Sequence, residues 1–224
     1  MVRVKICGVT NGRDALAACD LGAYALGFNF YEKSPRVVAP AEAWKLRQRL
    51  PAGVEAVGVF VNWKATAVVA LAEALQLSAV QLHGDEGPRD ATFCAKHVPV
   101  IKAFRVTPDL SLSELAKFRR VSGFLLDAAR AGQYGGTGST ADWSFARRAA
   151  ATRPIILAGG LTPENVAQAI LAVRPQAVDV ASGVESRPGK KDHGKMREFF
   201  CEVDRANREL AVTSADESVK VGTK

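Results

Sequence analysis

Apolar residues along this chain recur in short runs that are separated by longer segments with helical periodicity. The short runs begin near Val2, Tyr24, Ala56, Ala79, Val100, Gly123, Pro154 and Ala177. Successive starts lie 21 to 32 residues apart, which leaves room for a strand, a helix and short loops in each unit. The pattern therefore predicts eight consecutive strand–helix units.

The intervening segments have the spacing of amphipathic helices. Residues 68–75 and 166–173 both carry apolar side chains at positions i, i+3, i+4 and i+7. Thr162 can cap a helix that has Pro163 at its first position, and Pro40 can open another. These signals predict helix starts near residues 40 and 162.

Strands that alternate with helices favour a parallel sheet, and eight such units match the size of a closed (β/α)8 TIM barrel. The structural alternative is an open, doubly wound sheet. A G-x-G-x-x-G motif after the first strand would favour the open sheet, but residues 7–12 do not match it. We expect one barrel domain over residues 1–211, followed by a disordered tail, 212–224, whose residues are small and polar.

Composition and charge argue against several classes of protein. Of the 224 residues, 48% are apolar and 24% are charged, and no run approaches the roughly 18 apolar residues of a membrane span. The net charge of +7 indicates a bias toward anionic ligands. The basic residues are scattered, and the densest cluster, around Lys190 and Lys191, contains no aromatic residue for base stacking and is expected to be solvated. We expect neither nucleic acid nor membrane as a partner.

The four cysteines, Cys7, Cys19, Cys94 and Cys201, lie far apart with no C-x-x-C spacing. This spacing indicates neither a zinc site nor a disulfide framework. A first strand that begins at residue 2 also leaves no room for a signal peptide. We therefore expect a cytoplasmic protein that uses no metal and no organic cofactor.

Candidate chemistry gathers where the predicted strands end. In the first strand, Val2, Val4 and Ile6 share one face, so Lys5 and Cys7 share the other. Barrel enzymes carry their catalytic groups at the carboxyl-terminal rim, which is where Cys7 falls. The thiol and the ammonium group are therefore expected to lie together near the barrel mouth.

The same alternation directs further polar residues toward the barrel axis: Gln81, His83, Asp127 and Asp179. Ionisable groups in a barrel interior are costly unless they are paired or functional. His83 fits a hydrogen-bonded structural role better than a catalytic one. Asp179 either orients a ligand or pairs with Lys5, and the pattern leaves both open.

Glycine-rich turns follow the last two strands. Gly159 and Gly160 come after the seventh strand, and Ser182 and Gly183 come after the eighth. Exposed backbone N–H groups and helix N-termini suit a phosphate, which barrels commonly bind at this position, although ordinary turn glycines are the alternative. A third glycine segment, residues 135–138, lacks the lysine of a P-loop and is expected to be a flexible rim loop, with a lid as the alternative.

Several motifs together resemble phosphoribosylanthranilate isomerase of tryptophan biosynthesis, over residues 2 to about 208. They are Lys5-Ile6-Cys7-Gly8-Val9-Thr10, Gly27-Phe28-Asn29-Phe30, Ser34-Pro35-Arg36, Val59-Phe60-Val61, Gln81-Leu82-His83-Gly84, Leu126-Asp127, Gly135-Gly136-Thr137-Gly138, Ala158-Gly159-Gly160-Leu161 and Asp179-Val180-Ala181-Ser182-Gly183-Val184-Glu185. The segment Ser139–Trp143 departs from the family pattern, and the tail looks additional.

The resemblance implies an Amadori rearrangement of N-(5-phosphoribosyl)anthranilate to 1-(2-carboxyphenylamino)-1-deoxyribulose 5-phosphate. By similarity, Asp127 is the general acid that protonates the ribose ring oxygen, and Cys7 is the general base that removes the proton from the second carbon. Because a base must be a thiolate, we expect Lys5 to assist its ionisation.

The resemblance also implies a substrate held at both ends. Arg36 would bind the anthranilate carboxylate, and Asp179 is counted among the substrate-binding residues. The phosphate would be held by the backbone of Gly159, Gly160, Ser182 and Gly183. The oligomeric state, monomer or homodimer, is left open by the sequence.

Three rival functions fit the sequence less well. A sister phosphate-binding barrel is the nearest, but the aminoaldose isomerase of histidine synthesis resembles this plan with an aspartate in place of Cys7, and indole-glycerol-phosphate synthase would need a lysine array that is missing. A non-catalytic phosphosugar-binding barrel would lack one member of the acid–base pair, yet Cys7 and Asp127 are both present. A nucleic-acid-binding protein is disfavoured by the scattered charge.

Overall fold

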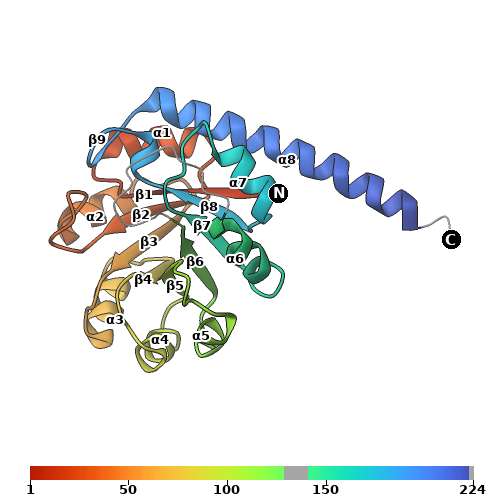
Figure 1. The fold of residues 1–224 in the computed structure, drawn as a ribbon. Coiled ribbons are helices and arrows are strands. Elements are labelled where there is room, and N and C mark those ends of the chain that lie inside the picture. Colours follow the sequence, from red (N-terminus) through yellow and green to blue (C-terminus); the bar gives the residue numbers. More distant parts are fainter. Residues whose placement is uncertain (129–140, 222–224) are drawn as a thin grey trace.

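Eight parallel strands form a closed barrel in the computed structural model, which describes residues 1–128 and 141–221 (Figure 1). The strands are β1 (Arg3–Cys7), β2 (Ala25–Asn29), β3 (Glu55–Phe60), β4 (Ala79–Leu82), β5 (Val100–Arg105), β6 (Gly123–Asp127), β7 (Ile155–Ala158) and β8 (Ala177–Val180). They follow one another around the barrel in chain order, and β8 closes it by pairing with β1. The predicted (β/α)8 barrel is confirmed, and each strand begins within one residue of its expected start.

The helices surround the barrel on its outside (Figure 1). They are α1 (Gly12–Asp20), α2 (Pro40–Arg47), α3 (Ala65–Ala74), α4 (Pro88–Cys94), α5 (Leu112–Ala116), α6 (Ala141–Ala150), α7 (Val166–Val173) and α8 (His193–Val221). A short 3-10 helix, η1 (Ser182–Val184), and a small hairpin of β9 (Glu185–Arg187) and β10 (Lys190–Lys191) lie between β8 and α8.

One predicted helix start is confirmed and one is wrong. Pro40 opens α2 as expected. Helix α7 begins at Val166 rather than after Thr162, because Asn165 folds the preceding residues into a turn. Its Oδ1 accepts the backbone N–H of Thr162 at 2.9 Å, and its Nδ2 donates to the carbonyl oxygen of Gly160 at 2.9 Å. This side chain delays the helix and shapes the loop after β7.

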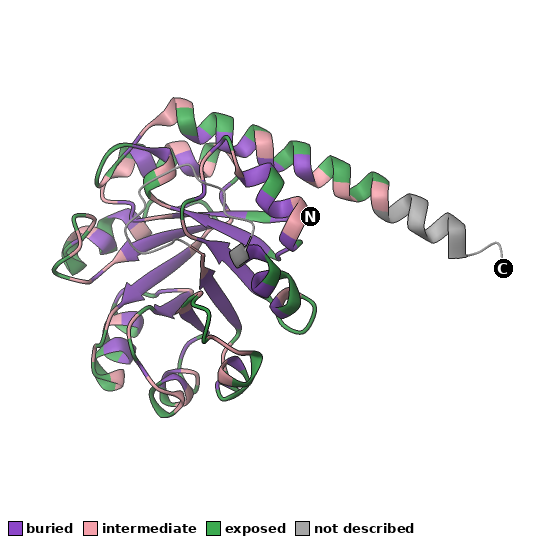
Figure 2. Ribbon diagram, in the orientation of Figure 1, coloured by how far each residue is buried: buried purple, intermediate pink, exposed green. Residues whose placement is uncertain are grey.

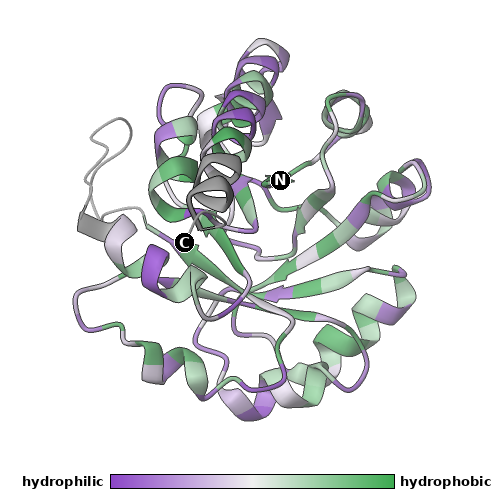
Figure 3. Cartoon of the chain, turned by 90° about the vertical axis from the view of Figure 1, so that its right-hand side faces the viewer, coloured by the Kyte–Doolittle hydropathy of each residue, from purple (hydrophilic) through white to green (hydrophobic). Residues whose placement is uncertain are grey.

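Strand alternation divides the core into two layers. The outer layer joins the sheet to the helices and contains residues such as Val4 and Ile6 of β1. The inner layer fills the barrel with mostly small side chains: Ala25, Val57, Ala79, Ile101, Ala103, Leu125, Ile156, Ala158 and Ala177. The strands are buried almost throughout, and apolar residues dominate them (Figures 2 and 3). Charged residues deep on the inner face, such as Lys5 and Asp179, are therefore surrounded by protein.

Helix α8 packs against α7 and α1 and buries Met196, Phe199 and Val203, which lie at positions i, i+3 and i+7. The expected domain boundary at residue 211 falls inside this helix, whose end at Val221 also crosses the expected tail. The boundary and the disorder of residues 212–224 stay predictions. Among the described residues, no helix is both long and apolar enough to cross a bilayer.

Candidate active site

A cavity of about 790 Å³ opens at the carboxyl-terminal ends of the barrel strands. It is lined by nearly all of the residues that the sequence singled out for this rim: Cys7, Arg36, His83, Asp127, Gly159, Gly160, Asp179 and Ser182. Gly183 does not line it, although it lies in the turn directly after Ser182. Chain segments from β1 to β8 thus converge on one concave site.

The base of this cavity holds a buried ion pair. Lys5 is fully buried, and its Nζ lies 2.7 Å from Oδ1 of Asp179. Burial by itself lowers the pKa of Lys5, but Asp179 and Cys7 outweigh it and raise the pKa above its ordinary value. The ammonium group therefore stays charged at neutral pH, and of the two sequence alternatives for Asp179, the pairing with Lys5 is present.

Cys7 and Lys5 come together because Gly27 of β2 has no side chain. A Cβ at this glycine would lie 2.8 Å from Sγ of Cys7 and 3.1 Å from Nζ of Lys5. Both groups occupy the space that any other residue would fill. The close approach that the strand alternation predicted for Lys5 and Cys7 thus depends on a neighbouring strand.

The pKa of the Cys7 thiol is raised above its ordinary value. Burial is the largest cause and Asp179 acts in the same direction, while Lys5 and Lys191 act to lower the pKa. Lys5 thus has the predicted direction of effect but does not overcome burial. Burial thus works against the thiolate form that a base needs, and the two ammonium groups work in its favour.

Asp127 lies at the end of β6, opposite Arg105 in the parallel register. His83, which also lines the cavity, is held at Nδ1 by the Gln81 amide nitrogen at 2.6 Å. Burial lowers the pKa of His83, although Asp127 acts to raise it, so the imidazole is neutral at pH 7. The acid predicted for the reaction, Asp127, therefore lies next to Arg105 in the sheet and acts electrostatically on a neutral ring.

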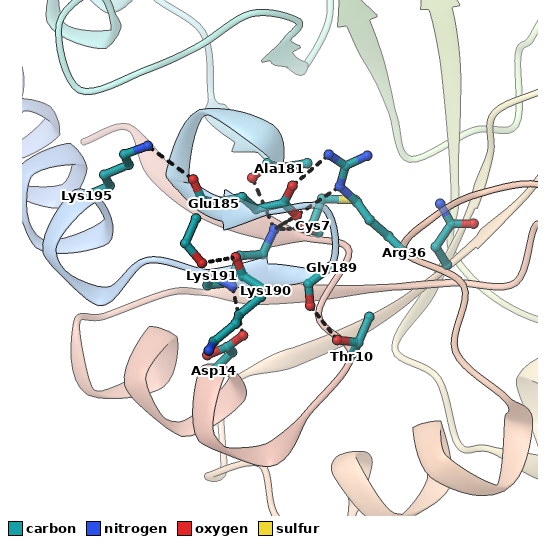
Figure 4. Close-up of polar contacts among 12 residues, drawn as sticks. Cys7, Thr10, Asp14, Arg36, Ala181, Glu185, Gly189, Lys190, Lys191 and Lys195 are labelled. Atoms are coloured by element: carbon teal, nitrogen blue, oxygen red, sulfur yellow. Dashed lines mark hydrogen bonds and ion pairs between the residues drawn. The ribbon is translucent and has the colours of Figure 1, made fainter.

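Arg36, at the cavity edge, is paired with the carboxylate of Glu185 (Figure 4). Its Nε lies 2.8 Å from Oε1 of Glu185, and its Nη2 lies 2.6 Å from Oε2 of the same carboxylate. The Lys191 ammonium group contacts Glu185 from the other side, with 2.9 Å between Nζ and Oε1. Arg36 therefore enters the site already oriented by a buried carboxylate.

Sequence reasoning missed Glu185 and Lys191 as parts of the site. Lys191 was expected on a solvated basic surface, but it is 3% exposed, so that expectation is wrong for this residue. It lies on β10, where it faces the barrel while its neighbour Lys190 faces solvent. The alternation in two residues is too short to be recognised, and the partner Arg36 is 149 residues away from Glu185 in the chain.

The turns expected to bind phosphate lie against each other. A Cβ at Gly183 would stand 1.8 Å from the carbonyl oxygen of Leu161, so only glycine allows the turn after β8 to meet the loop after β7. Gly160 and Ser182 both line the cavity beside this contact. The first N–H groups of a short helix such as η1 lack partners within the helix, which suits an anion. The predicted rim loop at residues 135–138 lies outside the described residues.

Comparison with known proteins gives a consistent result. The family model described as N-(5'phosphoribosyl)anthranilate (PRA) isomerase matches residues 4–202. N-(5'-phosphoribosyl)anthranilate isomerase of Trichlorobacter lovleyi is 51% identical over 202 residues, which cover 89% of this chain and 97% of that protein.

Solved structures agree with this match. Phosphoribosyl anthranilate isomerase from Thermotoga maritima is 44% identical with a TM-score of 0.84, over 91% of this chain and 99% of that one. A phosphoribosyl anthranilate isomerase in complex with reduced 1-(o-carboxyphenylamino)-1-deoxyribulose 5-phosphate is 42% identical with a TM-score of 0.82, over the same shares. A monomeric form generated from the dimeric Thermotoga maritima enzyme is 41% identical with a TM-score of 0.81, again over 91% and 99%.

Proposed function

Because this chain belongs to the family of N-(5'-phosphoribosyl)anthranilate isomerases, we propose that Cys7 and Asp127 perform the acid–base chemistry of that isomerisation in the barrel mouth. The chain is an isomerase of tryptophan biosynthesis. The observation that supports the two roles is that both side chains line one cavity from different strands, β1 and β6. A base and an acid on separate strands can reach different atoms of one sugar.

The proposed reaction is an Amadori rearrangement of N-(5'-phosphoribosyl)anthranilate. Asp127 gives its proton to the ribose ring oxygen while the bond between that oxygen and C1 breaks, and the nitrogen lone pair forms the C1–N double bond. The Cys7 thiolate then takes the proton from C2, and the electron pair moves to form the C1–C2 double bond of an enolamine. Protonation at C1 and loss of the proton on the C2 oxygen give the aminoketose, and proton exchange restores both residues.

The two anionic ends of the substrate would be held by backbone N–H groups at one end and by a guanidinium group at the other. The phosphate would sit on the backbone of Gly159, Gly160, Ser182 and Gly183. The anthranilate carboxylate would face Arg36, whose planar fork matches a carboxylate. With both ends fixed, C2 would come to the thiol side of the cavity and the ring oxygen to the Asp127 side.

Asp179 forms an ion pair with Lys5, with 2.7 Å between Oδ1 and Nζ. We therefore propose that its contribution to substrate binding goes through the ion pair. We further propose a cytoplasmic enzyme that needs no metal or organic cofactor and acts as a monomer or homodimer. A dimer has a precedent in the Thermotoga maritima relative.

The test is to follow the fluorescence of the anthranilate adduct in the presence of the next enzyme of the pathway. Cys7→Ala and Asp127→Ala should each lower kcat by about 100- to 10,000-fold, the usual contribution of a positioned acid or base. Cys201→Ala and Asp109→Asn, at exposed positions, are the matched controls and should retain full activity. Near-normal rates in either site variant, with thermal unfolding unchanged, would rule out its role.

A further inference from the structure

A buried ammonium group lies under the junction of β1, β8 and the β9–β10 hairpin (Figure 4). Nζ of Lys191 donates to the carbonyl oxygen of Cys7 at 2.6 Å, to that of Ala181 at 3.1 Å and to Oε1 of Glu185 at 2.9 Å. Three acceptors use all three protons of an ammonium group. Lys191 therefore ties the strand end that carries the catalytic thiol to the turn after β8.

Glu185 extends this arrangement to the cavity edge. It is 7% exposed, and it takes the edge of the Arg36 guanidinium group that carries Nε and Nη2. The aliphatic part of Arg36 packs over Gly8, the residue after the thiol. Among the described residues, only Glu185 hydrogen-bonds to the guanidinium group, through Nε and Nη2, so its other edge, at Nη1 and the second proton of Nη2, can take a ligand. Arg36 lines the cavity.

The charges in this cluster also favour an anionic ligand. Burial would raise the pKa of Glu185, but Arg36 and Lys191 outweigh it and lower the pKa, so the carboxylate is ionised at neutral pH. Two cations and one anion give a net charge of +1 at the cavity edge. A ligand carboxylate would neutralise it.

We infer that Glu185 and Lys191 are positioning residues that hold the Arg36 guanidinium group at a fixed position relative to Cys7. They thereby set selectivity for a substrate whose aryl group carries a carboxylate. The inference rests on the proposed function and adds to it a cause for the orientation of Arg36. A rotated or detached guanidinium group would still be charged but would no longer present its free edge at a fixed distance from the thiol. The contacts of Glu185 and Lys191 thus fix the distance between the group that binds the substrate carboxylate and the thiol that acts on C2.

The test compares two substrates that differ only in the carboxylate, prepared by condensing ribose 5-phosphate with anthranilic acid or with aniline. For the anthranilate adduct, Glu185→Gln should raise KM by about 10- to 100-fold, the value of one or two charge-assisted hydrogen bonds, and change kcat by less than about threefold. For the aniline adduct, the variant and the wild type should have the same kcat/KM within about threefold. A purely structural role would impair both substrates alike.

Fluorescence titration with the reduced product analogue, with and without its carboxylate, gives the same comparison where turnover of the aniline adduct is too slow. An equal loss on both ligands, or no loss on either, would overturn the inference. If the wild type itself fails to convert the anthranilate adduct, the proposed function fails, and the binding titration still reports on Glu185 separately.

Lys191→Met extends the test, with Lys190→Met as its matched control. Lys190 is the neighbouring exposed lysine, so its removal changes the net charge equally without touching Arg36 or Cys7. Because Lys191→Met leaves Glu185 buried without its ammonium partner, the double variant Lys191→Met/Glu185→Gln serves if the single one unfolds. We expect Lys191→Met and the double variant to lose selectivity for the carboxylate, as Glu185→Gln does. Lys190→Met should keep that selectivity. Loss of selectivity in Lys190→Met as well would overturn the inference.

Discussion

Lys5 and Lys102 are buried to a similar degree and each is paired with a carboxylate, yet of these two only Lys5 adjoins the catalytic thiol. Lys5 is 0% exposed and lies 2.7 Å from Asp179, while Lys102 is 3% exposed and lies 3.0 Å from Glu86. A buried ion pair is thus a poor marker of function by itself. The difference between the two lies in which face of its strand each lysine occupies.

Lys102 is on the outer face of β5, between the sheet and the helices. Its Nζ donates to the carbonyl oxygens of Leu82 and Gly84 as well as to Glu86, so its three protons are used within the protein. Glu86 in turn accepts the backbone N–H of Asn62 at 2.7 Å. This pair fastens the loops after β3 and β4 to β5.

Lys5 is on the inner face of β1, and its surroundings differ in one essential respect. It has the thiol of Cys7 beside it across Gly27, so its charge acts on a group that can lose a proton. Lys5 therefore affects the ionisation of the catalytic thiol, while Lys102 stabilises the loops that it contacts. The comparison predicts that loss of either lysine lowers stability, but that only loss of Lys5 lowers the rate of catalysis.

The largest expected effect is on stability. Lys102→Met should lower the free energy of unfolding by about 3 to 5 kcal/mol, because it leaves Glu86 buried without its cation. The kcat of the molecules that remain folded should not change. Chemical denaturation and active-site titration measure the two quantities. Lys117→Met, which breaks an exposed pair with Glu114, is the control and should cost under about 1 kcal/mol. A drop in kcat for Lys102→Met would contradict the distinction drawn between Lys102 and Lys5.

The second prediction concerns the thiol. Lys5 lowers the pKa of Cys7 against burial, so Lys5→Met should raise that pKa further. Since each pKa unit is a tenfold change in thiolate at neutral pH, kcat and the rate of Cys7 alkylation should both fall by about 10- to 100-fold. The alkylation midpoint should move to higher pH, measured by peptide mass spectrometry with the exposed Cys201 as internal reference.

The pH dependence of stability gives an independent check on Lys5. Its folded-state pKa lies above the ordinary 10.5, so its contribution to stability is complete below 10.5 and is lost only as pH rises through the folded-state value. Lys5 is therefore charged at neutral pH, so a slower alkylation of Lys5→Met at that pH reflects loss of the charge and not its titration. An alkylation profile that is the same in wild type and Lys5→Met, or an equal shift in Lys102→Met, would contradict the role given to Lys5.

The smallest expected effect is at Gln81, a buried but uncharged residue on the inner face of β4. Gln81→Leu removes the group that holds Nδ1 of His83 at 2.6 Å and frees the ring to rotate in the cavity. We expect kcat/KM to fall by about 3- to 10-fold and stability to change by about 1 kcal/mol, the range of one neutral hydrogen bond. Gln168→Leu on the exposed face of α7 is the control. An unchanged kcat/KM would show that the position of His83 does not matter to the reaction.

The fold and most of the catalytic rim could be predicted from local pattern. Period-two alternation located the strands and told which of their side chains face the barrel axis, and helical periodicity located the elements between them. The start of α7 was misplaced because the side chain of Asn165, rather than the cap at Thr162, decides where that helix begins. A hydrogen bond of this kind leaves no periodic signal.

Sequence by itself determined the barrel, the direction of Lys5 and Cys7, and the meeting of Cys7 and Asp127 at one rim, since all of these follow from strand parity and from the fact that parallel strands end on the same side. Only the tertiary structure decided that Glu185 and Lys191 lie beside Arg36, that the protons of Lys102 go to Leu82, Gly84 and Glu86, and that burial leaves the thiol with a raised pKa. The physical reason is range. Parity acts between neighbours in the chain, whereas charge pairing and desolvation depend on which distant segments the fold brings into contact.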